Sequence, residues 1–347
     1  MQDVFYALAK KESVKILVIA TKFLGDLIVS TPGLKHLRQK YPQAEIVLLV
    51  RSEYENVLKN NPNVNRIISF DFSIRNKKLL ERISAELSFW KKIRKEKFDV
   101  VISLQPGDRI AFLALVSGAK IRIAPRKQAF NFLFNVLVDV EEDSISYLEY
   151  YNRLISAFTN EPINYKTEFF ISKGNENSAE EFLRSNNLGK DESLIVIHPG
   201  ASEPTKIWQS ENFAELIGKI LSINKTKVLL IAGPKEENIV KDIFEKVKSK
   251  NVFFYNSQDV NLTAALMKRG RLFISNDTGT RHLAVALKIP VIALMPDDNQ
   301  NCWNFYDESD NHFVITGKRF FPEGESPYLG DISAEDVFTK LKNILSL

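Results

Sequence analysis

The stretch Leu-Phe-Ile-Ser-Asn-Asp-Thr-Gly-Thr-Arg-His-Leu at residues 272–283 decides the fold. An apolar run typical of a strand leads into Asp277-Thr278-Gly279, and helical sequence follows at once. Glycine lets the backbone turn tightly and lets a ligand approach it closely. The free N–H groups of a first helical turn favour an anion such as phosphate. Asp277 would repel phosphate unless it has another partner, such as a sugar hydroxyl. The stretch therefore indicates a ligand with a phosphate and a polyol part, or simply an N-cap.

The same alternation of short apolar strands and amphipathic helices runs along the whole chain. The first half is predicted to hold strands at 14–20, 45–50, 64–70, 99–104, 120–124 and 135–140, and helices at 26–40 and 146–158. The second half is predicted to hold strands at 193–198, 227–232, 251–255, 271–275 and 290–294, and helices at 212–223, 236–248, 261–268 and 280–287. This rhythm predicts an α/β protein with two Rossmann-like domains and parallel sheets.

The two rounds of strands and helices set the expected domain boundaries. We predict domains at 1–172 and 173–330, followed by a C-terminal helix at 331–347. Ser333 and Asp336 are spaced like a capping box at the start of that helix. Whether the helix returns to the first domain is left open. Ligands of such sheets bind at the carboxyl ends of the strands, so we expect a site in a cleft between the domains.

Composition narrows the class of protein. The 347 residues are 44% hydrophobic and 26% charged, which is normal for a globular enzyme. The single cysteine, Cys302, excludes an intramolecular disulfide and a cysteine-rich zinc site. The sequence lacks a signal-peptide core and any run of about 18 apolar residues. A cytoplasmic protein is expected.

The charge balance is mildly basic, with a net charge of +4. This excess is too small for a dedicated nucleic-acid binder, but it suits anionic substrates. The most basic stretch, 75–97, also carries Leu, Ile and Trp at helical spacing. It is interpreted either as an amphipathic helix at lipid headgroups or, in the favoured interpretation, as a surface helix with a solvated charged face.

Three further strand ends carry candidate chemistry. Asp26 follows Gly25 after the first strand, where a carboxylate could act as a general base or merely cap a helix. In the loop after His198, Lys206 could neutralise a phosphate, with Ser202 and Thr205 adding hydrogen bonds. The alternative is an ordinary surface lysine. The loop is not a Walker A motif.

The strand end at Ala232-Gly233-Pro234 is followed by Glu236 and Glu237, which open a helix. Acidic residues there stabilise the helix in any case, and one of them could bind a ribose. No His-Glu-x-x-His pair and no Gly-x-Ser-x-Gly motif occurs, so neither zinc hydrolysis nor that serine chemistry is expected. No metal and no cofactor is predicted.

Taken in order, these motifs resemble a known family. They are Gly25-Asp26, Pro199-Gly200-Ala201 with Lys206 and Trp208, Ala232-Gly233-Pro234 with the glutamates, and Asp277-Thr278-Gly279 with His282. The chain, over about 14–345, is similar to bacterial lipopolysaccharide core heptosyltransferases of glycosyltransferase family 9. The resemblance implies a GT-B fold and an inverting, metal-independent transfer. It implies ADP-L-glycero-β-D-manno-heptose as donor, bound by the C-terminal domain, and Kdo-lipid A or a growing inner core as acceptor.

The resemblance also implies roles for single residues. Asp26 would take the acceptor proton and Lys206 would neutralise the leaving diphosphate. Asp277 would hold donor-sugar hydroxyls, and either Glu236 or Glu237 would meet the ribose. The full implied donor set is Ser202, Thr205, Lys206, Glu236, Glu237, Asp277, Thr278, Gly279 and His282, the last supporting the loop.

On the acceptor side the loop 105–109 is similar to the family's acceptor loop. Gln105, Arg109 and Arg126 are the candidate contacts to acidic Kdo or phosphate, and solvated surface is the alternative for the arginines. The partners implied are a nucleotide sugar and a lipid-linked acidic saccharide, with peripheral contact at the inner membrane left open and no nucleic acid.

Three alternatives to heptose transfer remain. The first is a family member with another nucleotide sugar or surface-glycan acceptor, because the turn at 295–298 reads Met-Pro-Asp-Asp where the family often has a Phe-Gly-Pro-Thr-like turn. The others are a non-hydrolysing sugar-nucleotide epimerase and a non-catalytic sugar-nucleotide-binding protein.

Overall fold

The computed structural model divides the chain into two compact units, Met1–Thr167 and Glu168–Leu347, close to the expected boundary at 172/173. It describes residues 11, 13–72, 78–127, 129–141, 144–189, 191–234, 236–256, 259–298, 300–324 and 326–347. Arg75 and Lys77, from the basic stretch, lie outside these ranges.

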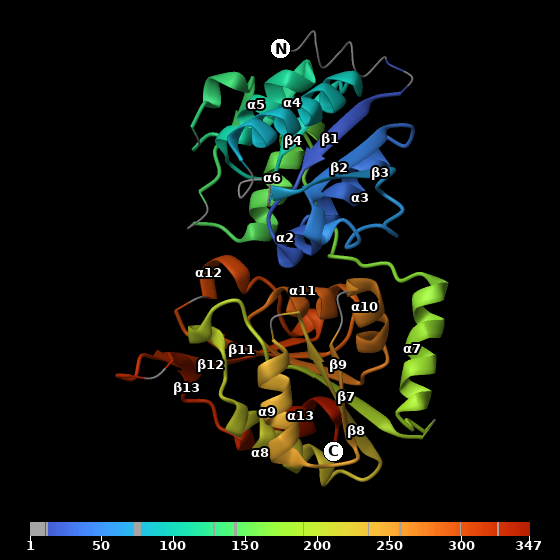
Figure 1. Ribbon diagram of the computed structural model, residues 1–347, viewed down its shortest axis with the longest axis vertical. Coiled ribbons are helices and arrows are strands. Elements are labelled where there is room, and N and C mark those ends of the chain that lie inside the picture. Colours follow the sequence, from blue (N-terminus) through green and yellow to red (C-terminus); the bar gives the residue numbers. More distant parts are fainter. Residues whose placement is uncertain are drawn as a thin grey trace. The chain divides into compact units, whose positions relative to one another are not determined.

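The first unit is built on a parallel six-stranded sheet in the order β3-β2-β1-β4-β5-β6 (Figure 1). Its strands are β1 Lys15–Ile19, β2 Glu45–Arg51, β3 Arg66–Phe70, β4 Val100–Ser103, β5 Ile121–Pro125 and β6 Val136–Val138. Its helices are α2 Leu24–Val29, α3 Thr31–Lys40, α4 Leu79–Lys95, α5 Asp108–Ser117 and α6 Tyr147–Thr159, with the short 3-10 turns η1 Ser52–Tyr54 and η3 Asn131–Leu133. Helix α4 packs with α5, and α2 and α3 pack with α6.

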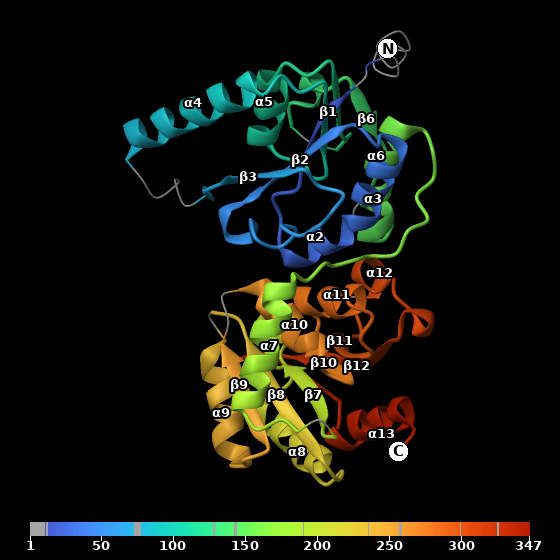
Figure 2. The same cartoon turned by 90° about the vertical axis from the view of Figure 1, so that its right-hand side faces the viewer.

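The second unit has a seven-stranded sheet in the order β13-β12-β11-β10-β7-β8-β9, parallel except for the β12–β13 pair (Figure 2). Its strands are β7 Ser193–His198, β8 Thr226–Ala232, β9 Val252–Asn256, β10 Leu272–Asn276, β11 Val291–Pro296, β12 His312–Phe320 and β13 Tyr328–Gly330. Its helices are α7 Lys173–Ser185, α8 Ser210–Leu221, α9 Glu237–Val247, α10 Val260–Lys268, α11 Gly279–Ala286, α12 Gln300–Trp303 and α13 Ala334–Leu345, with the 3-10 turns η4 Pro204–Lys206 and η5 Glu308–Asp310.

The central strands explain why the sequence folds into such sheets. The residues of β1, β7 and β10 are almost continuously apolar and buried. Strands buried on both faces are typical of parallel sheets covered by helices, whereas one-sided sheets alternate. The predicted α/β architecture is confirmed.

One predicted helix is two helices in the structure. The sequence predicted a helix over 26–40, but α2 ends at Val29 and α3 begins at Thr31. The Ser30 side chain bonds back to the Leu27 carbonyl, and Pro32 lies in the first turn of α3. Proline lacks an N–H and suits only a first turn, so it separates the two helices.

The C-terminal helix belongs to the second unit. The Ser333 side chain accepts a hydrogen bond from the Asp336 N–H at 3.1 Å, as expected for its N-cap. Val337 and Leu341 of α13 join the core that α8 and β8 build. The helix is therefore part of the unit Glu168–Leu347, and its return to the first domain stays a prediction.

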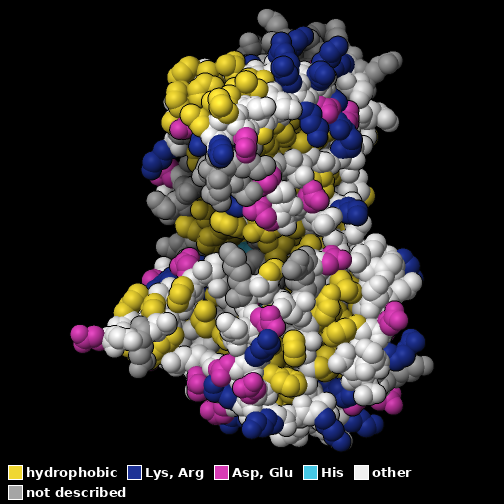
Figure 3. Space-filling view, viewed as in Figure 1, with side chains coloured by type: hydrophobic (Ala, Val, Ile, Leu, Met, Phe, Trp, Pro, Cys, Tyr) yellow, Lys and Arg dark blue, Asp and Glu magenta, His cyan; other side chains and the backbone are white. Residues whose placement is uncertain are grey.

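The first unit exposes a group of large hydrophobic side chains. We call it the apolar patch; it comprises Leu79, Leu80, Ile83, Leu87, Phe112, Leu115, Phe130 and Phe132. Figure 3 shows hydrophobic side chains gathered over the region of α4 and α5, with Lys and Arg side chains beside them. In the described part of the chain, no helix is both long and apolar enough to span a membrane.

Candidate active site

Asp26 lies in the first turn of α2, directly after the first strand, and only 6% of it is exposed. Its carboxylate accepts a hydrogen bond from the Phe23 N–H at 3.1 Å and another from the Tyr151 hydroxyl of α6. The α6 helix thus holds the carboxylate in place from a distant part of the sequence. Tyr151 had no role in the sequence analysis, because nothing local links it to residue 26.

The surroundings of Asp26 make it a stronger base than an ordinary aspartate. Burial raises its pKa, and the Tyr151 hydroxyl, the Lys22 charge and the Phe23 N–H lower the pKa by less. The net shift is upward because a carboxylate away from water is disfavoured in its charged form. Lys22 lies over the ring of Tyr147, 4.8 Å from its centre, which places a cation near the carboxylate.

An open pocket of about 840 Å³ lies at the carboxyl ends of β1 and β4. Its walls come from the loops after β1, β2, β3 and β4, and the residues are Thr21, Arg51, Glu53, Phe72, Gln105, Pro106, Gly107, Asp108, Arg109 and Ile110. Gly107, which leads into α5, has a φ of 153°, a conformation that favours glycine. The predicted acceptor loop therefore lines a pocket.

The three predicted acceptor residues have different surroundings. Gln105 is buried and bonds to Thr21, whose N–H donates to its Oε1 at 3.0 Å. Arg109 stacks on Phe70, 3.8 Å from the ring centre, and pairs with Glu86 of α4. Arg126 lines no part of this pocket and pairs with Asp139 on the exposed surface. The structure thus brings together Gln105 and Arg109 but not Arg126.

In the second unit Asp277 lies between two cations, and only 6% of it is exposed. The Lys206 ammonium is 3.1 Å from its Oδ2, and the Arg281 guanidinium is 2.9 Å from its Oδ1. Arg281 comes from the first turn of α11 and is fully buried. Burial raises the pKa of Asp277. The charges of Arg281 and Lys206 together lower it by a larger amount, so the pKa is below its usual value.

Two uncharged histidines lie behind this cluster. His282 is buried, and its Nδ1 is 3.2 Å from the Tyr306 hydroxyl. Burial and the nearby Arg281 hold its pKa well below the usual range. His312 of β12 lies 3.2 Å from Arg281, and burial together with that charge lowers its pKa to about 3. The His282 side chain is thus surrounded by other side chains of the protein.

A second cluster at the same strand ends joins His198 to Glu236. The His198 Nε2 is 2.7 Å from Glu236 Oε2, and the Gly233 N–H donates to the same oxygen at 2.6 Å. Burial raises the pKa of Glu236, but the bonds of His198 and Gly233 outweigh it and the pKa is lowered. A Cβ on Gly200 would lie 2.2 Å from the Glu236 carboxyl, so only glycine allows this approach.

The two glutamates that the sequence could not separate differ clearly. Glu236 faces His198, whereas Glu237 pairs with Lys241 one turn along α9. The His198 ring also reaches the start of α11, where its Nδ1 is 3.0 Å from the Thr280 hydroxyl. That hydroxyl is 2.6 Å from the Thr278 hydroxyl. Glu236, His198, Thr278 and Thr280 therefore form one chain of polar contacts.

The loop that carries Lys206 is fixed from both sides. Its Trp208 is fully buried, and the indole N–H donates to the Ile332 carbonyl at 3.0 Å. Asn276, at the end of β10, accepts from the Trp208 N–H at 3.2 Å and donates to the Pro199 carbonyl at 2.6 Å. These contacts bring Lys206 to Asp277, a residue 71 positions further along the sequence.

The two other candidate residues of this loop, Thr205 and Ser202, differ in their surroundings. The Thr205 hydroxyl accepts from Arg319 of β12 at 2.6 Å, and Arg319 also pairs with Asp298 at 3.0 Å. Asp298 belongs to the turn that departs from the family pattern, so this turn supports the loop through Arg319. Ser202 is exposed. Among the described residues no three His, Cys, Asp or Glu side chains group as metal ligands would.

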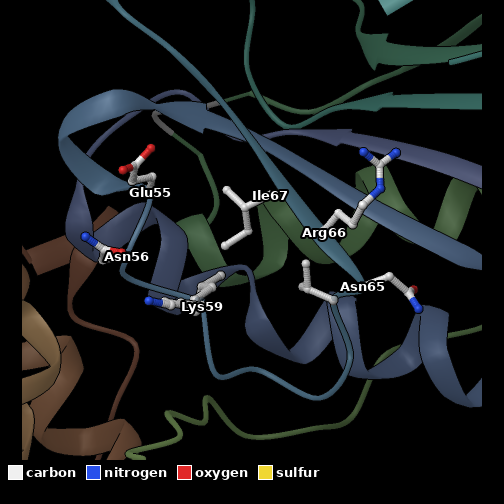
Figure 4. Close-up of a pocket in the computed structure, with 8 residues that line it drawn as sticks. Glu55, Asn56, Lys59, Asn65, Arg66 and Ile67 are labelled. Atoms are coloured by element: carbon white, nitrogen blue, oxygen red, sulfur yellow. The ribbon is translucent and has the colours of Figure 1, made fainter. Parts of the chain in front are cut away.

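A second pocket, of about 320 Å³, lies beside β3 (Figure 4). Its lining includes Glu55, Lys59, Asn65 and Arg66. Asn65 accepts from the Ile46 N–H at 2.8 Å, and Arg66 pairs with Glu45 and Glu96. The polar side chains Asn65 and Arg66 thus bind to neighbouring strands and helix ends of the protein, and we assign no chemistry to this pocket.

Sequence reasoning missed several contributors to these clusters. They are Arg51, Tyr151, His198, Asn276, Arg281 and Arg319. Arg51, His198 and Asn276 lie at strand ends and Arg281 lies in a first helical turn, and this position is a signal that could have marked them. Tyr151 and Arg319 come close to the site only through the tertiary fold.

Two helix-covered parallel sheets, each with polar clusters at the carboxyl ends of its strands, define a GT-B glycosyltransferase fold. The chain belongs to glycosyltransferase family 9 (heptosyltransferase), whose family model matches residues 86–320. It is a glycosyltransferase of the heptosyltransferase type, and not one of the epimerases considered as an alternative.

Individual relatives agree with the family match. Lipopolysaccharide heptosyltransferase 3 of Escherichia coli (strain K12) is 25% identical over 342 residues, covering 93% of this chain and 96% of that protein. The structure of a family 9 glycosyl transferase from Veillonella parvula superposes with a TM-score of 0.83 at 23% identity, covering 96% and 97% of the two chains. The structure of E. coli ADP-heptose lps heptosyltransferase II gives a TM-score of 0.78 at 22% identity, covering 96% and 99%.

Proposed function

We propose that the protein transfers heptose from ADP-L-glycero-β-D-manno-heptose to the inner core of lipopolysaccharide, with inversion and without a metal. The observation that carries the proposal is the Lys206–Asp277 contact of 3.1 Å beside the first turn of α11. At this end of the strands, Lys206 supplies a cation and the start of α11 supplies free N–H groups. Both suit a diphosphate leaving group. The donor named for the E. coli heptosyltransferase II supports ADP-heptose as the first substrate to test.

The donor half of the reaction depends on stabilising the negative charge that develops on the leaving ADP. When the bond between the heptose anomeric carbon and the diphosphate oxygen breaks, the electron pair leaves with ADP. We assign the stabilisation of that growing charge to Lys206, which is largely buried, and to the N–H groups of Thr278 and Gly279. Fixed donors in a water-poor site stabilise such charge more than water does. Asp277, held by Arg281, keeps Lys206 in position and is also our candidate for donor-sugar hydroxyls.

For the ribose we choose Glu236 over Glu237. Glu237 is engaged with Lys241 on the side of α9, whereas Glu236 lies with His198 at the strand ends. The bonds from His198 and Gly233 both use Oε2, and we assign Oε1 to a ribose hydroxyl.

For the acceptor we propose Asp26 as general base. It takes the proton of the attacking hydroxyl while that oxygen bonds to the anomeric carbon of heptose from the face opposite the diphosphate. Its raised pKa makes the proton transfer more favourable. Arg51 and Arg109, which line the neighbouring pocket, are cations suited to the carboxylates or phosphates of an inner core.

The test is a transfer assay with ADP-heptose and Kdo-lipid A, in which product is detected as a heptose mass increment. Asp26→Asn should lower the transfer rate by about 10²- to 10⁴-fold, the usual contribution of a general base. ADP should still protect this variant from thermal unfolding. Lys206→Met is the matched variant: it should weaken ADP binding as well as transfer, because it removes a phosphate partner.

Two results would contradict the proposal in different ways. Full transfer by Asp26→Asn would remove Asp26 as the base. Wild-type protein that binds UDP or GDP in preference to ADP would instead point to another nucleotide sugar, which the turn at 295–298 also allows.

A further inference from the structure

We propose that the apolar patch, together with the lysines at the end of α4, is a docking surface for an anionic lipid bilayer. The inference goes beyond the proposed transfer reaction, because it concerns a surface and a partner that the chemistry of the site does not require. It starts from the crowding of exposed hydrophobic residues. Eight of the twelve large exposed hydrophobic side chains in the described part of the chain belong to this patch.

Exposed apolar and cationic side chains follow one another along α4. Leu79, Ile83 and Leu87 are spaced by four residues and are all exposed, and Lys91 and Lys95 continue the same spacing. With 3.6 residues per turn, each step of four residues turns the position by about 40°, so this row winds around the helix. The exposed surface of α4 is therefore apolar over the first half of the helix and cationic over the second.

The charge of α4 favours a negatively charged partner. The helix carries five Lys or Arg residues against two Glu residues, and Glu86 is engaged with Arg109. Lys91, Lys92, Arg94 and Lys95 are all exposed. Apolar side chains beside a group of cations are typical of helices that lie in the headgroup region of a membrane. A second copy of this chain, with its own net charge of +4, is a less complementary partner.

The aromatic side of the patch extends this surface away from α4. Phe112 of α5 is 5.0 Å from Phe130, which is 6.1 Å from Phe132 at η3. Leu80 and Phe132 are 81% and 74% exposed, values at which a hydrophobic side chain gains little from the fold. Buried in acyl chains, the same side chains would contribute favourably to binding.

The patch is continuous with the acceptor-side pocket. Helix α5 begins at Asp108 in the pocket wall and exposes Phe112 one turn later. Glu86 of α4 pairs with Arg109, another residue of the wall. A bilayer bound at the patch would hold lipid-linked sugars near the mouth of that pocket.

The experiment is vesicle flotation of the full chain with phosphatidylglycerol–phosphatidylethanolamine vesicles, and with phosphatidylcholine vesicles for comparison. We expect wild-type protein to float with the anionic vesicles and to dissociate in high salt, because salt screens the lysines. Leu80→Ser and Phe132→Ser should each weaken binding about tenfold, since each removes an apolar side chain from the contact. Lys91→Gln with Lys95→Gln should weaken it about fivefold for each charge.

Phe321→Ser is the matched control, because Phe321 is 71% exposed but lies outside the patch. It should bind vesicles like the wild type. All patch variants should keep their transfer rate on a de-acylated, water-soluble acceptor. That readout separates docking from chemistry: loss of transfer by wild type on every acceptor would overturn the proposed function and leave the docking result standing.

Two outcomes would overturn the docking surface. One is wild-type protein that fails to float with anionic vesicles at low salt. The other is a set of patch variants that bind as the wild type does. If the wild type sediments as a dimer and Leu80→Ser as a monomer, with no vesicle binding by either, the patch is a contact between two copies and the proposal is wrong.

Discussion

Asp26 and Asp277 occupy equivalent places in the two units, and their carboxylates have opposite properties. Each follows a central strand and lies at the start of a helix, and each is 6% exposed. Burial raises the pKa of both. Only Asp277 has two full cations in contact, and its net pKa is lowered, whereas that of Asp26 is raised. The same burial thus accompanies a raised pKa in one unit and a lowered pKa in the other.

The difference teaches that partners, not position, determine what a buried carboxylate can do. Asp26 receives bonds from a neutral hydroxyl and one N–H, which support its charge only in part. Asp277 is bonded to the guanidinium of Arg281 and the ammonium of Lys206. Local sequence shows the position of each carboxylate, but the partners come from the tertiary fold.

The largest expected effect is on the stability of the second unit. Asp277→Asn leaves the fully buried Arg281 without its anion, so the free energy of unfolding should fall by about 3–5 kcal/mol. Asp26→Asn should stay within about 1 kcal/mol of wild type, because it removes a charge that burial already disfavours. Urea denaturation of both variants measures the contrast. Equal losses would show that the two sites do not differ as described.

A smaller effect concerns the acid sensitivity of the Arg281 cluster. The pKa of His312 is about 3 in the folded protein, against 6.5 for an ordinary histidine. Between these values the unfolded chain binds the proton and the folded protein does not, so stability falls as pH falls from 6.5 towards 3. Each pH unit in this window costs about 1.4 kcal/mol per such group.

His312→Gln keeps an acceptor for Arg281 but cannot titrate. Between pH 7.5 and 5 it should therefore lose about 2 kcal/mol less stability than the wild type. His282, whose pKa is also lowered, acts in the same direction, so the acid sensitivity should be reduced and not abolished. Denaturant midpoints at the two pH values measure it, and an unchanged loss would mean that His312 does not stay neutral.

The smallest effect is a shift in a pH profile. Tyr151→Phe removes a hydrogen bond that lowers the pKa of Asp26, so the acidic limb of the kcat/KM profile should move to higher pH. At pH values above that limb the rate should remain within about tenfold of wild type, because the variant keeps Asp26 itself. Tyr147→Phe is the control, since its ring contacts that of Tyr151, while the groups that lower the pKa of Asp26 are Tyr151, Lys22 and the N–H groups of Phe23 and Asp26. A limb that moves equally in both variants would argue against the Tyr151 bond.

The strands were predictable because their burial is continuous. Apolar runs in the sequence coincide with the buried parts of β1, β2, β7, β8 and β10. Helix α7 was not predicted, because among its thirteen residues only Ala179 and Leu183 are buried and the rest read as a polar linker. Strand β12 was missed for a similar reason, since its burial is mixed and it lies towards the sheet edge.

The site was predictable only where it lies on strand ends. Asp26, Lys206, Asp277 and the pair Glu236 and Glu237 became candidates because each lies in the segment that follows an apolar run. The choice of Glu236 over Glu237 needed the three-dimensional contact with His198. Arg126 shows the opposite limit: a basic residue just past a strand, whose partner Asp139 no local pattern reveals.

The bond between Gln105 and Thr21 has a consequence for the thermodynamics of acceptor binding. It fastens the loop after β4 to the loop after β1, so the pocket wall and the approach to Asp26 are set before any ligand arrives. A sugar that enters this pocket then has few loop conformations to freeze, and less of its contact energy is spent on ordering protein. We therefore expect these two loops to change their conformation little when an acceptor binds to this unit.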